Sequence, residues 1–124
     1  MAGRAGGASE LGRRGEQAAR LWYAEHGYEV LARNWRCAHG EIDLVCTRRD
    51  GAGAATLVVC EVKTRTSAAR GHPLEAVTPA KQRRLRRLAA AFLRAQDRRF
   101  GHVRFDVVAV HGHTLDVLVV EGAF

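Results

Sequence analysis

The chain has 124 residues, with 20 lysines and arginines against 13 aspartates and glutamates and a formal net charge of +7. This length predicts one domain that buries a core without a disulfide or structural metal, and no apolar run is long enough to cross a membrane. The positive charge is typical of proteins that bind nucleic acid, although an arginine-rich composition also fits a GC-rich genome.

The first segment is rich in glycine and alanine, so we predict a disordered tail over residues 1–8 ahead of a single domain over residues 9–124. Ser9 is suited to cap a helix that runs to about His26 and ends at Gly27. Helical spacing gives this helix an apolar stripe of Leu11, Ala18, Ala19 and Trp22.

Three strands are predicted next from their apolar patterns and the turn residues between them, over residues 28–35, 41–48 and 56–64. A small-residue loop containing Asp50 and Gly51 joins the second strand to the third as a hairpin. The third strand is the most continuously apolar of the three, which is typical of a central strand.

The second half of the chain predicts a crossover. A polar stretch over residues 64–78 leads to Thr78 and Pro79, which are suited to begin a helix running to about Arg98. Two more strands, 102–110 and 114–120, follow. A right-handed crossover makes the fourth strand parallel to the third. We therefore predict an α/β fold of order α-β-β-β-α-β-β, with a mixed five-stranded sheet flanked by helices. The second helix should bury Leu85, Leu88, Ala89 and Phe92.

The most informative residues lie on the second and third strands. Glu61 and Lys63 are two apart and share one side of their strand, and Asp43 interrupts the apolar run of the strand before it. Two converging carboxylates are what Mg²⁺ or Mn²⁺ requires, and a lysine beside them can position a water for attack on phosphate. The alternative is a solvent-facing ion pair of little consequence.

The second helix carries positive charge on the face opposite its apolar stripe. This charge could contact a phosphate backbone, but a solvated face explains it equally well, because a crossover helix always has an outward side. The basic residues are Lys81, Arg83, Arg84, Arg86, Arg87 and Arg94.

Cysteine content favours a cytoplasmic protein. Cys37, Cys46 and Cys60 are odd in number and lie in or near apolar strands, as expected of reduced, buried thiols. The Gly- and Arg-rich start also differs from a secretory signal.

We interpret Glu41 and Asp106 as structural or ion-paired residues.

Taken together, these segments resemble the YraN-like family of uncharacterised bacterial proteins and, more distantly, the archaeal Holliday-junction resolvases. Both have the restriction-endonuclease-like fold with its PD-(D/E)xK nuclease pattern. The resemblance covers nearly the whole domain. It rests on Gly15-Glu16, Arg33-Asn34-Trp35-Arg36, Gly40-Glu41-Ile42-Asp43-Leu44-Val45, Glu61-Val62-Lys63-Thr64-Arg65, Lys81-Gln82 and Phe105-Asp106.

The resemblance implies metal-dependent hydrolysis of phosphodiester bonds in DNA, including branched or junction DNA. Asp43, Glu61 and the Val62 carbonyl would hold Mg²⁺ or Mn²⁺, and Lys63 would be the catalytic lysine. Ile42 stands where the pattern has proline. Resolution of a junction would need two sites and hence a homodimer.

Two further catalytic residues and a nucleic-acid surface follow from the same resemblance. Glu16 would be the extra acid that resolvases bring from the first helix, although an ordinary first-turn acid favoured by the helix dipole is an equal alternative. Gln82 would match the glutamine of the next helix. The residues expected to bind nucleic acid are Lys81, Arg83, Arg86, Arg87 and Arg65. A non-catalytic nucleic-acid-binding module on the same fold is the competing function.

Overall fold

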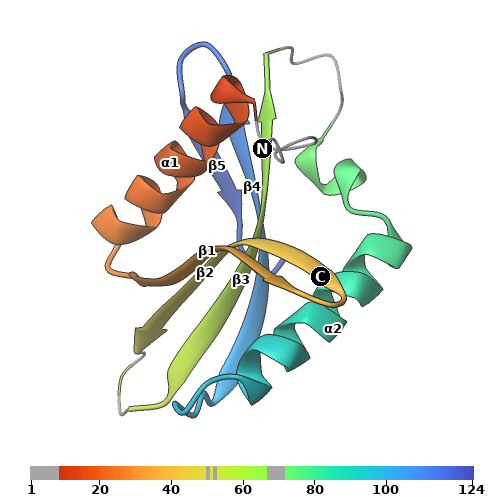
Figure 1. Ribbon diagram of the computed structural model, residues 1–124. Helices are drawn as coiled ribbons and strands as arrows, with labels where there is room; N and C mark the ends of the chain where they lie inside the picture. The colour runs from red at the N-terminus through yellow and green to blue at the C-terminus, as the bar shows by residue number, and fades with distance from the viewer. Residues whose placement is uncertain (1–8, 50, 52, 67–71) are drawn as a thin grey trace.

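Figure 1 shows the computed structural model, which describes residues 9–49, 51, 53–66 and 72–124; the tail predicted over residues 1–8 lies outside them. The predicted order of elements is confirmed, with one added short 3-10 helix, η3. The elements are α1 (Glu10–Glu25), β1 (Glu29–Cys37), β2 (Gly40–Arg49), β3 (Ala55–Arg65), η3 (Pro73–Ala76), α2 (Pro79–Arg94), β4 (His102–His111) and β5 (Val117–Val120).

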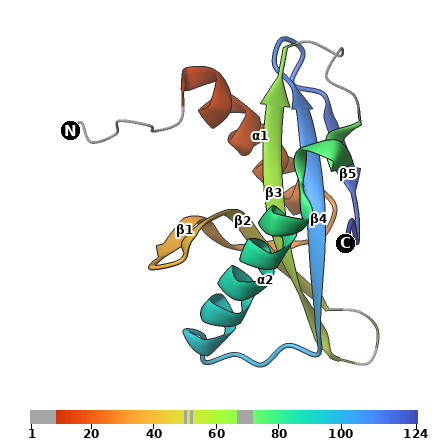
Figure 2. The same cartoon turned by 90° about the vertical axis from the view of Figure 1, so that its right-hand side faces the viewer.

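The five strands form one sheet in the order β1-β2-β3-β4-β5. Only β3 and β4 are parallel, and the other neighbours are antiparallel. The predicted mixed sheet is therefore confirmed. Helix α1 covers one face and α2 the other (Figures 1 and 2), so the sheet lies between two apolar clusters.

Both predicted helix starts are confirmed. The Ser9 side chain accepts a hydrogen bond from the Gly12 N–H at 3.0 Å, and the Thr78 side chain accepts one from the Lys81 N–H at 3.3 Å. Such caps satisfy N–H groups that the first helical turn leaves unpaired. The predicted core face of α2 is also confirmed, since its buried residues are Leu85, Leu88, Ala89 and Phe92.

Two predicted element ends were wrong. Helix α2 ends at Arg94 rather than near Arg98, because the chain must turn back for the Gly101 N–H to bond the Ala55 carbonyl before β4 begins. Strand β5 begins at Val117 rather than at residue 114. A turn closed by hydrogen bonds from Leu115 to His111 and from His111 to Asp116 takes up those residues.

The buried face of α1 differs from the predicted stripe. Ala19 is buried as expected, but its buried companions are Gly15 and Tyr23, whereas Leu11, Ala18 and Trp22 are only half-buried. A Cβ atom at position 15 would overlap the Thr64 hydroxyl. Glycine therefore lets α1 approach β3 closely at this point.

A polar network is buried between α1 and the sheet, which we call the Asp106 network: Tyr23, Tyr28, Arg104, Asp106 and the Gly122 N–H. The Asp106 side chain accepts hydrogen bonds from Tyr23 at 2.7 Å, twice from Arg104 at 2.9 Å and from Gly122 at 3.1 Å. Arg104 also donates to the Tyr28 hydroxyl at 2.8 Å. The predicted ion pairing of Asp106 is confirmed.

Within the described residues, no helix has the length and apolar character needed to span a membrane.

Candidate active site

The central feature of the candidate site is a fork between β2 and β3. These strands pair from Arg49 and Ala55 up to Leu44 and Cys60, and the same register would next place Asp43 opposite Glu61. From there β2 continues beside β1 alone and β3 beside β4 alone. Figure 1 shows the β1–β2 hairpin turning away from the axis of β3.

Packing against α2 accounts for the direction of this turn. The Trp35 ring of β1 meets the Phe92 ring of α2 edge-on, with centroids 5.2 Å apart. Ile42 and Leu88 belong to the same buried cluster. The end of the hairpin is therefore held by apolar contacts on the α2 face, and the fork is a fixed part of the core.

Asp43 lies at the branch point of the fork. One carboxylate oxygen accepts a hydrogen bond from the Val62 N–H at 2.8 Å, so this side chain replaces the backbone acceptor that a continued ladder would supply. Burial, followed by the negative charge of Glu61, raises the pKa of Asp43 to about 7 against the smaller, lowering effect of the Val62 hydrogen bond. No basic side chain forms an ion pair with Asp43 in the part of the chain that the structure describes.

Glu61 and Lys63 are side by side on β3, as their spacing predicts. The Lys63 Nζ lies 3.0 Å from a Glu61 carboxylate oxygen, and their side chains are 29% and 16% exposed. The lysine thus neutralises one of the two carboxylates at the fork and leaves the charge of Asp43 uncompensated. Asp43, Glu61 and Lys63 are brought together by the end of β2–β3 pairing.

Glu16 and Asp43 line one cavity of about 290 Å³. Glu16 follows Gly15 on α1, so the close approach of Gly15 to Thr64 carries it towards the sheet. Burial raises the pKa of Glu16, a hydrogen bond with Asn34 lowers it by less, and the charge of Glu41 raises it. The remaining lining residues are Arg13, Gln17, Arg20, Arg33 and Asn34.

Asn34 and three arginines of this cavity had no role assigned from the sequence. Asn34 has a positive φ of 50°, a backbone conformation that asparagine adopts more easily than most residues. Arg20 is half-buried, and its Nε has no hydrogen-bond partner among the described residues. Arg13 lies three positions before Glu16 and Arg20 lies four positions after it. Residues at these spacings are neighbours on a helix surface, so the sequence held a signal that could have identified both arginines.

The other residues expected to act in the site lie elsewhere. The Gln82 amide donates to the Val77 carbonyl at 3.2 Å and so fixes the turn before α2. Arg86 stacks over Phe105 and Phe124, with its guanidinium carbon 5.1 and 5.4 Å from the ring centroids. The lining of the Asp43 cavity includes neither Gln82 nor any of the residues predicted to bind nucleic acid: Arg65, Lys81, Arg83, Arg86 and Arg87.

The fork fits a hard divalent cation by its chemistry. Asp43 and Glu61 supply carboxylate oxygens and Val62 a main-chain carbonyl, which are donors that Mg²⁺ and Mn²⁺ prefer. A cation would also compensate the half-buried charge of Asp43. Across the described residues, no three His, Cys, Asp or Glu side chains are grouped closely enough to hold a metal ion. The protein therefore offers few side-chain ligands, and water would complete the coordination.

Comparison with known proteins places the fork inside a shared region. The sequence model of "Uncharacterised protein family UPF0102" matches residues 15–110. Relatives called "UPF0102 protein" include one from Clavibacter michiganensis, 52% identical over 82% of this chain and 81% of its own. A second, from Beutenbergia cavernae, is 55% identical over 81% and 80%. The relative from Acidothermus cellulolyticus is 47% identical over the full length of both chains. The predicted kinship with an uncharacterised bacterial family is confirmed, whereas the likeness to resolvases stays a prediction.

Proposed function

This chain belongs to uncharacterised protein family UPF0102, and we propose that it is a metal-dependent endonuclease that hydrolyses phosphodiester bonds in DNA. The observation that carries the proposal is the fork, where the uncompensated Asp43 carboxylate meets the Glu61–Lys63 pair. The single hydrogen bond from Val62 does not offset the cost of this arrangement, and perturbed carboxylates of this kind gather at functional sites.

Asp43, Glu61 and the Val62 carbonyl would hold Mg²⁺ or Mn²⁺. The bound ion would polarise the scissile phosphate and lower the pKa of a water. Lys63, held 3.0 Å from Glu61, would orient the attacking water and offset the negative charge that develops on the phosphate. Glu16 would orient a second water from the opposite wall of the cavity. Because the pKa of Asp43 is about 7, protonation below that pH would weaken both metal binding and cleavage.

Two arginines are suited to hold the phosphate beside the scissile bond. Arg20 and Arg33 line the cavity with Asp43, and the Arg20 Nε lacks a partner among the described residues. A guanidinium donates paired hydrogen bonds to phosphate oxygens. The arginines of α2 would form a second, more distant contact with the backbone of the nucleic acid. In that surface Arg83, Arg86 and Arg87 are all exposed, but Arg86 already stacks on two phenylalanines.

The test is a panel of labelled junction, flap, duplex and single-stranded DNA and RNA, incubated with Mg²⁺, Mn²⁺ or EDTA. We expect the parent to cleave at least one DNA with metal and none with EDTA. Asp43→Asn and Glu61→Gln should abolish cleavage, and Lys63→Ala should slow it by about 10²-fold or more. Asp97→Asn is the matched control, because this carboxylate is exposed and outside the Asp43 cavity.

Arg20→Gln and Arg33→Gln should reduce cleavage more than the triple replacement of Arg83, Arg86 and Arg87 by glutamine. Each variant should keep the circular dichroism spectrum of the parent. If the parent cleaves nothing and binds no Mn²⁺ even with DNA present, the endonuclease proposal fails.

A binding module without turnover is the second candidate, favoured by the net charge of +7 and the exposed arginines of α2. Neutralisation of ~4–6 phosphates predicts a log–log slope of affinity against salt of about −4 to −5 for duplex DNA. The triple α2 variant should flatten this slope, while Asp43→Asn should leave it unchanged. Binding with a steep slope, but no cleavage with any of the metals, would select the binding module. A flat slope would exclude both the binding module and the endonuclease.

A further inference from the structure

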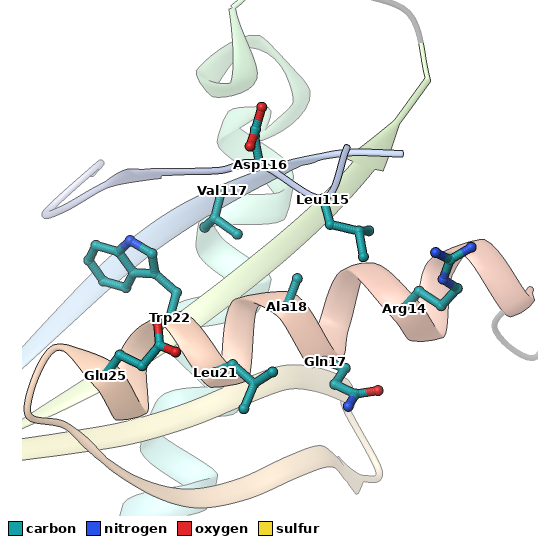
Figure 3. A pocket seen from close by; sticks show the side chains of 9 residues that line it. All are labelled: Arg14, Gln17, Ala18, Leu21, Trp22, Glu25, Leu115, Asp116 and Val117. Atoms are coloured by element: carbon teal, nitrogen blue, oxygen red, sulfur yellow. The ribbon is translucent and has the colours of Figure 1, made fainter. Parts of the chain in front are cut away.

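A second cavity, of about 510 Å³, lies between α1 and the segment that leads into β5. Figure 3 shows Arg14 near one end and Glu25 near the other, with Ala18 and Leu21 between them. Residues 115–117 form the opposite wall. The α1 wall consists of Arg14, Gln17, Ala18, Leu21, Trp22 and Glu25.

The six α1 positions of this groove are symmetric about one point of the helix. The pairs 14 and 25, 17 and 22, and 18 and 21 all share the same midpoint, between Ala19 and Arg20. When two copies of a helix pack antiparallel about a two-fold axis, residues related in this way face each other. The stripe 14, 18, 21 and 25 also has the four-three-four spacing of a helix–helix seam.

The charges on this stripe are complementary to themselves. In such a pair, Arg14 of each copy would lie opposite Glu25 of the other, so two opposite-charge contacts would form at the ends of the seam. Neither side chain has an ion-pair partner within the described residues, whereas the neighbouring Arg13 is paired with Glu10 at 3.0 Å. Both Arg14 and Glu25 are exposed.

The middle of the stripe is apolar. Leu21 is 44% exposed, which is unusual for a large apolar side chain at the centre of a groove, and Ala18, its neighbour on the stripe, is small. Leu21 of one copy would cover Ala18 of the other, twice. Small and large residues that alternate in this way let two helices approach closely. The apolar centre and charged ends match the usual anatomy of a protein interface.

We propose that the chain forms a symmetric homodimer in which the two α1 helices pack antiparallel across this groove. The proposal does not depend on the proposed nuclease activity. It has one consequence for the candidate active site: Gln17 lines both this groove and the Asp43 cavity, so each fork of the dimer would stand next to the paired helices.

The test is a charge exchange, measured by sedimentation velocity and light scattering. Arg14→Glu places two like-charged acidic contacts at the seam, and Glu25→Arg places two basic ones, so each variant alone should dimerise at least ten-fold more weakly than the parent. A mixture of the two variants restores both opposite-charge contacts and should form a heterodimer. The double variant, Arg14→Glu with Glu25→Arg, should again form a homodimer.

Two further variants separate the seam from general effects. Leu21→Arg should give a monomer with the circular dichroism spectrum of the parent, because this side chain is exposed in the single chain. Arg99→Glu, an exposed charge reversal outside the groove, should dimerise like the parent. A parent that stays monomeric at every concentration overturns the proposal. A dimer that neither charge reversal weakens, or a mixture that fails to pair, overturns it as well.

Discussion

Asp106 of β4 accepts four hydrogen bonds, from Tyr23, Arg104 and the Gly122 N–H, whereas Asp43 of β2 accepts one that the structure describes, from the Val62 N–H. Asp106 is paired with the Arg104 guanidinium at 2.9 Å. Asp43 instead stands beside a second carboxylate, that of Glu61, and burial together with this negative charge raises its pKa to about 7.

The two environments solve the cost of a buried carboxylate in opposite ways. A buried charge is tolerated when a cation and hydrogen bonds replace the water it has lost. Asp106 has both inside the protein, so its carboxylate belongs to the architecture. Asp43 lacks the cation, so its cost is relieved by protonation, as its raised pKa indicates, or by the metal ion that we propose. Four changes test this contrast, beginning with the largest expected effect.

Asp106→Asn should destabilise the fold most. It removes the anion that neutralises Arg104 and leaves a guanidinium whose side chain is only 21% exposed. Loss of one member of a buried pair costs about 3–5 kcal/mol, and we expect the low end because Glu121 remains 3.7 Å from Arg104. Urea unfolding at pH 7 measures the change. Asp97→Asn, which alters an exposed carboxylate, should stay within about 0.5 kcal/mol of the parent.

Asp43→Asn should instead stabilise the fold at alkaline pH. The pKa of Asp43 rises from 3.8 in the unfolded chain to about 7 in the fold, so the folded parent binds more protons between these values. The free energy of unfolding of the parent should therefore fall as pH rises from about 4 to about 7. Each pKa unit corresponds to about 1.4 kcal/mol, and solvent relaxation at this half-buried site reduces the whole effect to about 2 kcal/mol.

The asparagine variant should lack most of that fall and be more stable than the parent at pH 8, since its amide oxygen can still accept from Val62. Glu16, whose pKa is also raised, should leave a smaller slope of the same sign. Unfolding curves at pH 5 and pH 8 measure both chains. A parent whose stability rises with pH over this range would contradict the assignment of Asp43.

Addition of Mn²⁺ at pH 8 should stabilise the parent and Asp106→Asn alike, but not Asp43→Asn. A ligand at ten times its dissociation constant stabilises the folded state by about 1.4 kcal/mol, so the melting temperature should rise by a few degrees. The same buffer with EDTA in place of Mn²⁺ is the control. Equal stabilisation of all three chains would locate the bound metal outside the fork.

Lys63→Ala should change the free energy of unfolding least, by under about 1 kcal/mol, because its pair with Glu61 is partly exposed. Its effect on Asp43 is the sharper readout. Without the lysine, Glu61 repels Asp43 more strongly, so the pKa of Asp43 should rise above its value in the parent. Carbon-13 NMR titration of the aspartate carboxyl groups measures this shift. An unchanged titration would mean that Lys63 does not act on the fork.

Local patterns in the sequence predicted most of the architecture. The caps Ser9 and Thr78, the core face of α2 and the parallel pairing of β3 with β4 all follow from spacing, capping chemistry and crossover handedness. The shared side of Glu61 and Lys63 follows from strand alternation in the same way.

The rest depends on contacts between distant segments. Nothing in the residues of β2 shows that its pairing with β3 stops at Leu44, because the hairpin is turned by packing of Trp35 on Phe92. Glycine has no apolar side chain, so a hydropathy stripe could not reveal Gly15 as a buried position. Arg13 and Arg20 come from α1 and Arg33 from β1, and only the packing of α1 on the sheet brings these three arginines to one cavity.

The contact between Gly15 and Thr64 gives the site an adjustable spacer. Position 15 has no room for a side chain, so the size of residue 64 determines how far α1 stands from β3. Thr64→Ala or Thr64→Ile would change that size and so move Glu16 relative to Asp43 without altering either carboxylate. The separation of acidic groups in this fold can therefore be varied by a residue that carries no charge, which offers protein engineers a way to tune the cavity for metal ions of different radius.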